Sequence, residues 1–157
     1  KNTLVFKIET EGQGNVFIYE CPLMQLEYQD MNIEHANYTS IMTLSSSELQ
    51  TIFKHLVTFS DTVEIKSKDK QLYFSCNDDY DGKVYSVIGE ASDKFKVTSY
   101  NADFTGSFSL RYLCLFTKAT GISSSVQLLL SNPLVLHYSV SNLGTLKFIL
   151  AEKKETY

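Results

Sequence analysis

Residues 107 to 121 read Ser107-Phe-Ser-Leu-Arg-Tyr-Leu-Cys-Leu-Phe-Thr-Lys-Ala-Thr-Gly121. In this stretch Leu110, Leu113 and Cys114 recur at the spacing of one helical face, and the glycine that closes it is typical of a helix end. Arg111 and Lys118 are two helical turns apart, which puts them on one side of the same helix. The stretch therefore predicts a helix with an apolar stripe and a basic side.

A second helix is predicted from Leu44 to Leu56, which reads Leu-Ser-Ser-Ser-Glu-Leu-Gln-Thr-Ile-Phe-Lys-His-Leu. Ser45 and Glu48 have the spacing of a capping box, and Leu44 and Leu49 that of a hydrophobic staple. The predicted apolar face consists of Leu49, Ile52, Phe53 and Leu56, and the opposite, polar face of Thr51, Lys54, His55 and Thr58.

Most of the remaining chain reads as short strands rich in β-branched and aromatic residues, separated by turn residues. The predicted strands are Leu4–Ile8, Val16–Glu20, Tyr38–Leu44, Thr62–Lys66, Gln71–Cys76, Lys83–Glu90, Phe95–Tyr100, Val126–Leu130, Leu134–Val140 and Thr145–Leu150. With two helices among them, they predict an α+β fold built on antiparallel sheet. From Tyr38 onward the order strand, helix, several strands occurs twice, which indicates a pseudo-repeat.

The composition argues against several classes of function. The chain has 14 Lys and Arg against 18 Asp and Glu, a net charge of −4, so only a local basic face would bind nucleic acid. Its cysteines, Cys21, Cys76 and Cys114, lack zinc-site spacing, which suggests thiols in a reducing compartment. Residues 77–82 imitate a calcium loop, but Ile88 stands where a bidentate carboxylate belongs. We expect no cofactor, no metal and no catalytic residue. No apolar run is long enough for a membrane helix, so we expect no membrane partner.

The sequence resembles one known family. Phe108–Val126 is similar to the second helix and following turn in the C-terminal domain of PCNA-like sliding clamps (proliferating cell nuclear antigen). Pro133–Ala151 resembles the closing hairpin of that family, and residues 22–38 resemble its interdomain connector. The most specific part is Leu-Arg-Tyr-Leu followed by Phe-Thr-Lys-Ala-Thr within residues 110–120.

This resemblance implies the DNA-clamp fold, in which antiparallel sheets lie outside and two helices line the inner face of a ring. It divides the chain into terminal strands of a truncated N-terminal clamp domain (1–21), an interdomain connector (22–38) and a C-terminal clamp domain (39–157). Because the chain opens at Lys1 within a strand-like segment, we expect it to be part of a longer protein, a homotrimer when full length.

The implied function is that of a DNA polymerase processivity factor, which is not an enzyme. It encircles double-stranded DNA without sequence preference and tethers replication and repair proteins in the nucleus. The implied partners are the clamp-binding motifs of polymerases, nucleases and ligases, and a clamp loader. By resemblance Lys54, Arg111 and Lys118 face the DNA, where exchangeable phosphate contacts suit sliding. The alternative is that these three are ordinary solvated charges.

The resemblance also implies an apolar pocket for short partner peptides, formed by Met31, Ile33, Pro133, Ile149 and Ala151. Such a pocket would receive a helical plug. The alternative is that Met31 and Ile33 only fix the connector to the sheet. Two positions depart from the family pattern: Ile149 replaces a residue that is commonly aromatic, and Glu152 stands where proline is usual.

Subunit contacts are implied between two strand edges. One consists of Val16, Phe17, Ile18, Tyr19 and Glu20, and the other of Val84, Tyr85, Ser86, Val87 and Ile88. The alternative is that the first strand pair, without its domain, is disordered or packs locally. Two other readings of the whole chain stay open: a subunit of a heteromeric checkpoint clamp, and a β-rich protein-interaction domain without a DNA role. The second would show no positive face around Lys54, Arg111 and Lys118.

Overall fold

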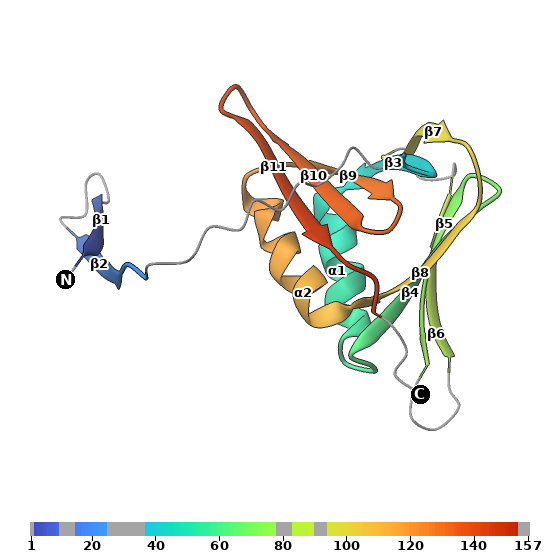
Figure 1. Ribbon diagram of the computed structural model, residues 1–157, viewed down its shortest axis with the longest axis horizontal. Helices are drawn as coiled ribbons and strands as arrows, with labels where there is room; N and C mark the ends of the chain where they lie inside the picture. Colours follow the sequence, from blue (N-terminus) through green and yellow to red (C-terminus); the bar gives the residue numbers. More distant parts are fainter. Residues whose placement is uncertain (1, 10–14, 25–36, 78–82, 90–93, 154–157) are drawn as a thin grey trace. The chain divides into compact units, whose positions relative to one another are not determined.

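The computed structural model describes residues 2–9, 15–24, 37–77, 83–89 and 94–153 (Figure 1). The chain divides into two compact units, residues 1–34 and residues 35–157. The smaller unit contains β1 (Thr3–Glu9) and β2 (Val16–Pro22), paired antiparallel with Thr3 opposite Pro22. This confirms the predicted strand pair. Every side chain of the two strands is exposed, so the ribbon has no core of its own.

The larger unit contains the remaining elements in two sheets. Its first part consists of β3 (Ser40–Ser45), α1 (Ser46–Leu56), β4 (Thr62–Lys68), β5 (Gln71–Asn77), β6 (Lys83–Ile88) and β7 (Lys96–Tyr100). Its second part consists of β8 (Phe104–Ser109), α2 (Leu110–Phe116), the 3₁₀-helix η1 (Thr117–Gly121), β9 (Ser125–Leu130), β10 (Leu134–Val140) and β11 (Gly144–Leu150). The α+β prediction and the pseudo-repeat are both confirmed.

The two repeats exchange their first strands. One sheet has the strand order β11-β10-β9-β3-β7, and the other has β6-β5-β4-β8. Thus β3, which opens the first repeat, pairs with β9 of the second, and β8, which opens the second, pairs with β4 of the first. Each sheet therefore contains strands from both repeats. The two α-helices, one from each repeat, lie side by side (Figure 1).

Helix α1 forms as predicted, but its start differs in detail. Leu49, Phe53 and Leu56 are buried and Ile52 is partly buried, whereas the predicted polar face is exposed. Ser45 is the N-cap residue, yet its side chain makes no capping hydrogen bond. The Ser45 hydroxyl instead lies 2.9 Å from the hydroxyl of Ser47, so the predicted capping box is wrong.

The second helix begins three residues later than predicted, because residues 107–109 belong to β8, a strand that the sequence analysis missed. Gly106 lies in the middle of this strand and interrupts the run of β-branched and aromatic residues by which strands are recognised. A Cβ atom at Gly106 would come within 2.9 Å of the Phe104 ring. The rings of Phe104 and Phe108 stack over the glycine with their centroids 6.3 Å apart. Glycine is therefore needed here because the two rings occupy the side-chain space.

Candidate functional site

The predicted basic residues lie on the paired helices and are exposed. Lys54 is on α1, Arg111 on α2 and Lys118 on η1. Polar contacts join α1 to η1. The side-chain amide of Gln50 donates to the Thr117 carbonyl at 2.9 Å. The Thr120 hydroxyl, with one proton to donate, lies 2.7 Å from the Thr117 carbonyl and 3.2 Å from the Ser46 carbonyl of α1. The three basic residues therefore belong to one layer formed by α1, α2 and η1, which we call the helical layer.

The helical layer is positive although the chain is negative. Residues 46–56 and 110–121 contain Lys54, Arg111 and Lys118 but a single carboxylate, Glu48. The layer thus carries three formal positive charges and one negative charge, within a chain of net charge −4. Thr51, also exposed on α1, adds no charge, and its hydroxyl donates to the carbonyl of Ser47 at 2.8 Å. A local field of this sign favours an anionic partner.

The electrostatics of Cys114 show that Lys54 lies near α2. Burial raises the pKa of the Cys114 thiol, and the positive charge of Lys54 opposes that rise by favouring the thiolate. Lys54 and Cys114 come from different helices, so a charge on α1 affects the pKa of a thiol on α2.

A second surface lies on the outer face of the β9–β10–β11 sheet. Strand register places Ile41, Leu129, Val135 and Ile149 directly across from one another on β3, β9, β10 and β11. Leu128, Leu130, Leu134 and Leu136 belong to the core cluster, so their odd-numbered neighbours face the other way. Leu129 and Val135 are nevertheless buried, and Ile149 is 37% exposed. We call these four residues the outer apolar row.

The sequence analysis missed Ile41, Leu129 and Val135, although a signal was present. Residues 128–130 and 134–136 are apolar at every position rather than at alternate ones. Continuous apolar runs in short strands indicate a sheet that is covered on both faces. These runs predicted strands, but the sequence analysis did not infer from them that the sheet has a second apolar face.

The pocket residues predicted near the end of the chain lie beside this row. Leu134 pairs with Leu150, and Pro133 and Ala151 are the residues immediately beyond this pair on the two strands. Pro133 is partly buried and Ala151 is exposed. The other two predicted pocket residues, Met31 and Ile33, lie outside the described residues. The structure thus gathers Pro133, Ile149 and Ala151 at one end of the β10–β11 ribbon.

A family comparison accounts for this arrangement. Residues 32–153 match the family model described as proliferating cell nuclear antigen, C-terminal domain. The chain belongs to the PCNA family. The match covers the helical layer, the exchanged sheets and the outer apolar row, and it supports the clamp fold that the resemblance implied. Members of the PCNA family are sliding clamps, non-enzymatic scaffolds that serve DNA replication and repair.

For this PCNA-family chain, the structure also describes the two predicted subunit edges. Val16–Glu20 lie in β2, half of an otherwise unpaired ribbon, and Val84–Ile88 lie in β6, the last strand of its sheet. Within the described strands both edges have backbone groups turned away from their single partner. Val87 is 45% exposed on β6.

The described residues offer no metal centre, because they contain no group of three or more His, Cys, Asp or Glu side chains placed to hold an ion. None of the helices in the described part of this PCNA-family chain is long and apolar enough to cross a membrane.

Proposed function

We propose that this chain is the C-terminal part of a DNA polymerase processivity clamp, with the domain boundaries expected from the resemblance: 1–21, 22–38 and 39–157. The observation that carries the proposal is the positive helical layer of a negatively charged PCNA-family chain. In the proposed ring, Lys54, Arg111 and Lys118 face double-stranded DNA. Contacts to phosphate need no base sequence and exchange readily, as sliding requires.

Salt dependence tests the DNA-facing role. The binding of a labelled DNA duplex is measured at several salt concentrations for the wild type and for Lys54→Gln/Arg111→Gln/Lys118→Gln. If all three contact phosphates, the slope of log K against log salt becomes shallower by roughly 2 to 3, about 0.9 per lost contact.

The control removes the same charge elsewhere. Lys68, Lys70 and Lys147 are exposed residues outside the helical layer, and their triple glutamine variant has the same net charge as the test variant. The proposal requires the control to keep the wild-type slope. Equal losses in the two variants would mean that the duplex responds only to total charge.

The accessible members of the outer apolar row, Ile41 and Ile149, form with Pro133 and Ala151 the proposed docking surface for partner peptides. Burial of apolar side chains from a short helical plug would stabilise the complex, and the neighbouring main chain would orient it. By the family resemblance, these peptides are the clamp-binding motifs of polymerases, nucleases and ligases. Met31 and Ile33 are proposed as the connector side of the same pocket.

For the full-length protein we propose a homotrimer in the nucleus, placed on DNA by a clamp loader. Its proposed subunit contact pairs the edge of β2 with the edge of β6 in the next copy. The heteromeric checkpoint clamp is the competing assembly. Mass measurement of the full-length chain, purified alone, separates them: a trimer of one chain supports the proposal, and a monomer that trimerises only with different chains overturns it.

A further inference from the structure

The edge strand β7 has an unused side. It is the last strand of its sheet and pairs with β3, and among the described residues no strand covers its other edge. The register shifts between Ile41 and Met42, whose partners are Ser99 and Val97, so Thr98 is an extra residue on β7. Backbone N–H and C=O groups on such an edge are available to a further strand.

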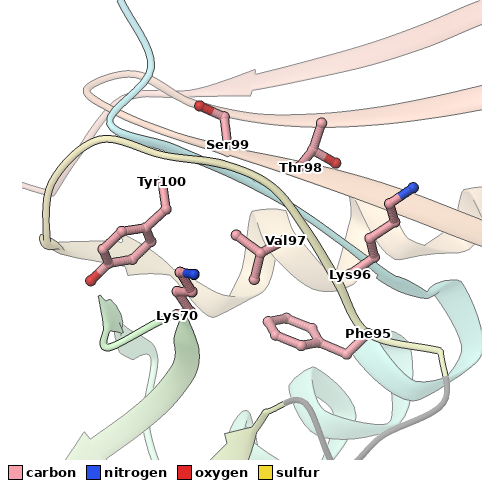
Figure 2. A pocket seen from close by; sticks show the side chains of 7 residues that line it. All are labelled: Lys70, Phe95, Lys96, Val97, Thr98, Ser99 and Tyr100. Carbon is pink, nitrogen blue, oxygen red and sulfur yellow. The ribbon is translucent and has the colours of Figure 1, made fainter.

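A cleft of about 540 Å³ runs along this edge. It is lined by Lys70 from the β4–β5 turn and by Phe95, Lys96, Val97, Thr98, Ser99 and Tyr100 (Figure 2). Figure 2 shows Lys70 on the side to which Val97 and Tyr100 point, whereas Lys96 and Thr98 point to the other side. The cleft therefore has a lysine on each face of the strand.

Tyr100 fixes one end of the cleft. Its hydroxyl donates a hydrogen bond to the carboxylate of Asp103, and this bond raises the pKa of Tyr100. The main-chain N–H groups of Lys70 and Asp69 act on the same oxygen and oppose the rise. Asp69 and Lys70 form a tight turn with φ of 51° and 60°. Tyr100 and the turn that carries Lys70 therefore meet at this end of the cleft.

The residues that line the cleft carry two positive charges, Lys70 and Lys96, and no negative one. Both lysines are exposed, and neither forms an ion pair within the described part of the chain. Two carboxylates lie just outside the lining: Asp103 accepts a hydrogen bond from the Tyr100 hydroxyl, and Asp69 is next to Lys70 in the turn. Exposed lysines and a bulge also protect edge strands from unwanted pairing, and that protective role is the competing explanation.

We propose that the open edge of β7 binds an extended acidic peptide as an added strand. The backbone of the peptide pairs with β7, and its carboxylates reach Lys70 on one face and Lys96 on the other. Because side chains alternate between faces, the two acidic residues are an odd number of positions apart; a separation of three spans about 10 Å. The cleft lies at the free edge of β7, whereas Ile41 of the outer apolar row is on the neighbouring strand β3, across from Ser99. The proposed pairing does not depend on the clamp function.

The test uses the full chain and a fluorescent peptide, Thr-Glu-Val-Thr-Glu-Val-Thr, followed by polarisation. We expect saturable binding that weakens at least about tenfold in Lys70→Glu/Lys96→Glu, because two attractive contacts become repulsive. Amide chemical shifts should move along residues 95–100. Lys147→Glu, on the opposite edge strand β11, reverses a charge of the same kind and should leave the affinity within about twofold of wild type.

A second peptide separates strand addition from simple charge attraction. It has the same sequence, but alternate backbone amides are methylated, which removes the donors that a new strand needs. The proposal requires this peptide to bind at least about tenfold more weakly. Three outcomes would each overturn the proposal and leave edge protection as the role of the lysines. The two peptides bind equally well, a DNA duplex binds to residues 95–100 as tightly as the peptide does, or the peptide does not bind at millimolar concentration.

Discussion

The side-chain amide of Gln50 is 2.9 Å from the carbonyl oxygen of Thr117, the residue at which α2 ends and η1 begins. The same carbonyl lies 2.7 Å from the Thr120 hydroxyl, so Gln50 adds a donor from α1 to a carbonyl that also has a partner in its own repeat. The Gln50 bond crosses between the two pseudo-repeats. It also fixes the helix that carries Lys54 against the one that carries Arg111.

Gln50→Leu should destabilise the chain by about 1 kcal/mol, because a part-buried hydrogen bond between the two repeats is lost while the side-chain volume is kept. Urea unfolding measures the change as a lower midpoint at constant slope. Thr51→Ala is the control on the same helix, since its exposed hydroxyl bonds only to the Ser47 carbonyl. If Thr51→Ala loses as much stability as Gln50→Leu, the loss cannot be attributed to the hydrogen bond between Gln50 and Thr117.

Ile149→Asp should weaken the binding of a peptide that carries the Gln-x-x-hydrophobic-x-x-aromatic-aromatic clamp-binding motif. A carboxylate in the outer apolar row would be desolvated by the plug, and the expected loss is at least about tenfold. Fluorescence titration measures the dissociation constant. Leu143→Asp places the same change at a residue that is 85% exposed, in the β10–β11 turn, and should bind as wild type.

Glu152→Ala should lower the free energy of unfolding by about 1 kcal/mol. The two carboxylate oxygens of Glu152 each lie 3.3 Å from a donor, the N–H of Ser107 and the side-chain amide of Asn132. Glu152 thereby joins the end of β11 to both sheets. Lys153→Ala, which removes an exposed bond to Thr62, is the control and should change the free energy by less than about 0.5 kcal/mol. Thermal unfolding ranks the two variants, and a reversed ranking would contradict the assignment.

Tyr138→Phe should leave stability at neutral pH unchanged, or raise it by up to about 1 kcal/mol. The Tyr138 hydroxyl is buried, and within the described part of the chain it has no hydrogen-bond partner, so its removal relieves a desolvation cost. Urea unfolding of the wild type and of the variant measures this difference.

The same residue predicts a pH dependence. Burial raises the pKa of Tyr138 to about 12, above the value of about 10 for a free tyrosine. Because the folded-state pKa is the higher one, the free energy of unfolding keeps its full value below about pH 10 and falls as the pH rises towards about 12. Tyr138→Phe should lack this part of the alkaline decline, whereas Tyr112→Phe, at an exposed position, should keep it. A decline that is identical in both variants would refute this origin.

The sequence predicted the elements better than their connections. Periodicity found both helices and every observed strand except β8, whose pattern is interrupted by Gly106 under two stacked rings. Local patterns carry no information about which strand pairs with which, so the exchange of β3 and β8 between the sheets was beyond their reach. Capping failed for a similar reason: the Ser45 hydroxyl found Ser47 rather than the helix backbone.

The site was only partly predictable. Lys54, Arg111 and Lys118 were named through the family resemblance, and the structure places all three in the exposed helical layer; their role remains a prediction. The outer apolar row needed strand register, because Ile41 and Ile149 are far apart in sequence and meet only through β9 and β10. The cleft at β7 needed the turn at Lys70 to be placed beside it, which no sequence pattern indicates.

The exchange of first strands has a consequence for how the chain is made. Within this chain β3 begins at residue 40, whereas its two neighbours in the sheet begin at residue 96 (β7) and residue 125 (β9). Until these strands have been synthesised, Met42 and Leu44, which end up wholly buried, have no complete sheet to join. The nascent chain must therefore hold an apolar strand without its neighbours while the intervening segments are made, and chaperones that shield such strands should matter more for its yield than for that of a domain whose repeats close separately.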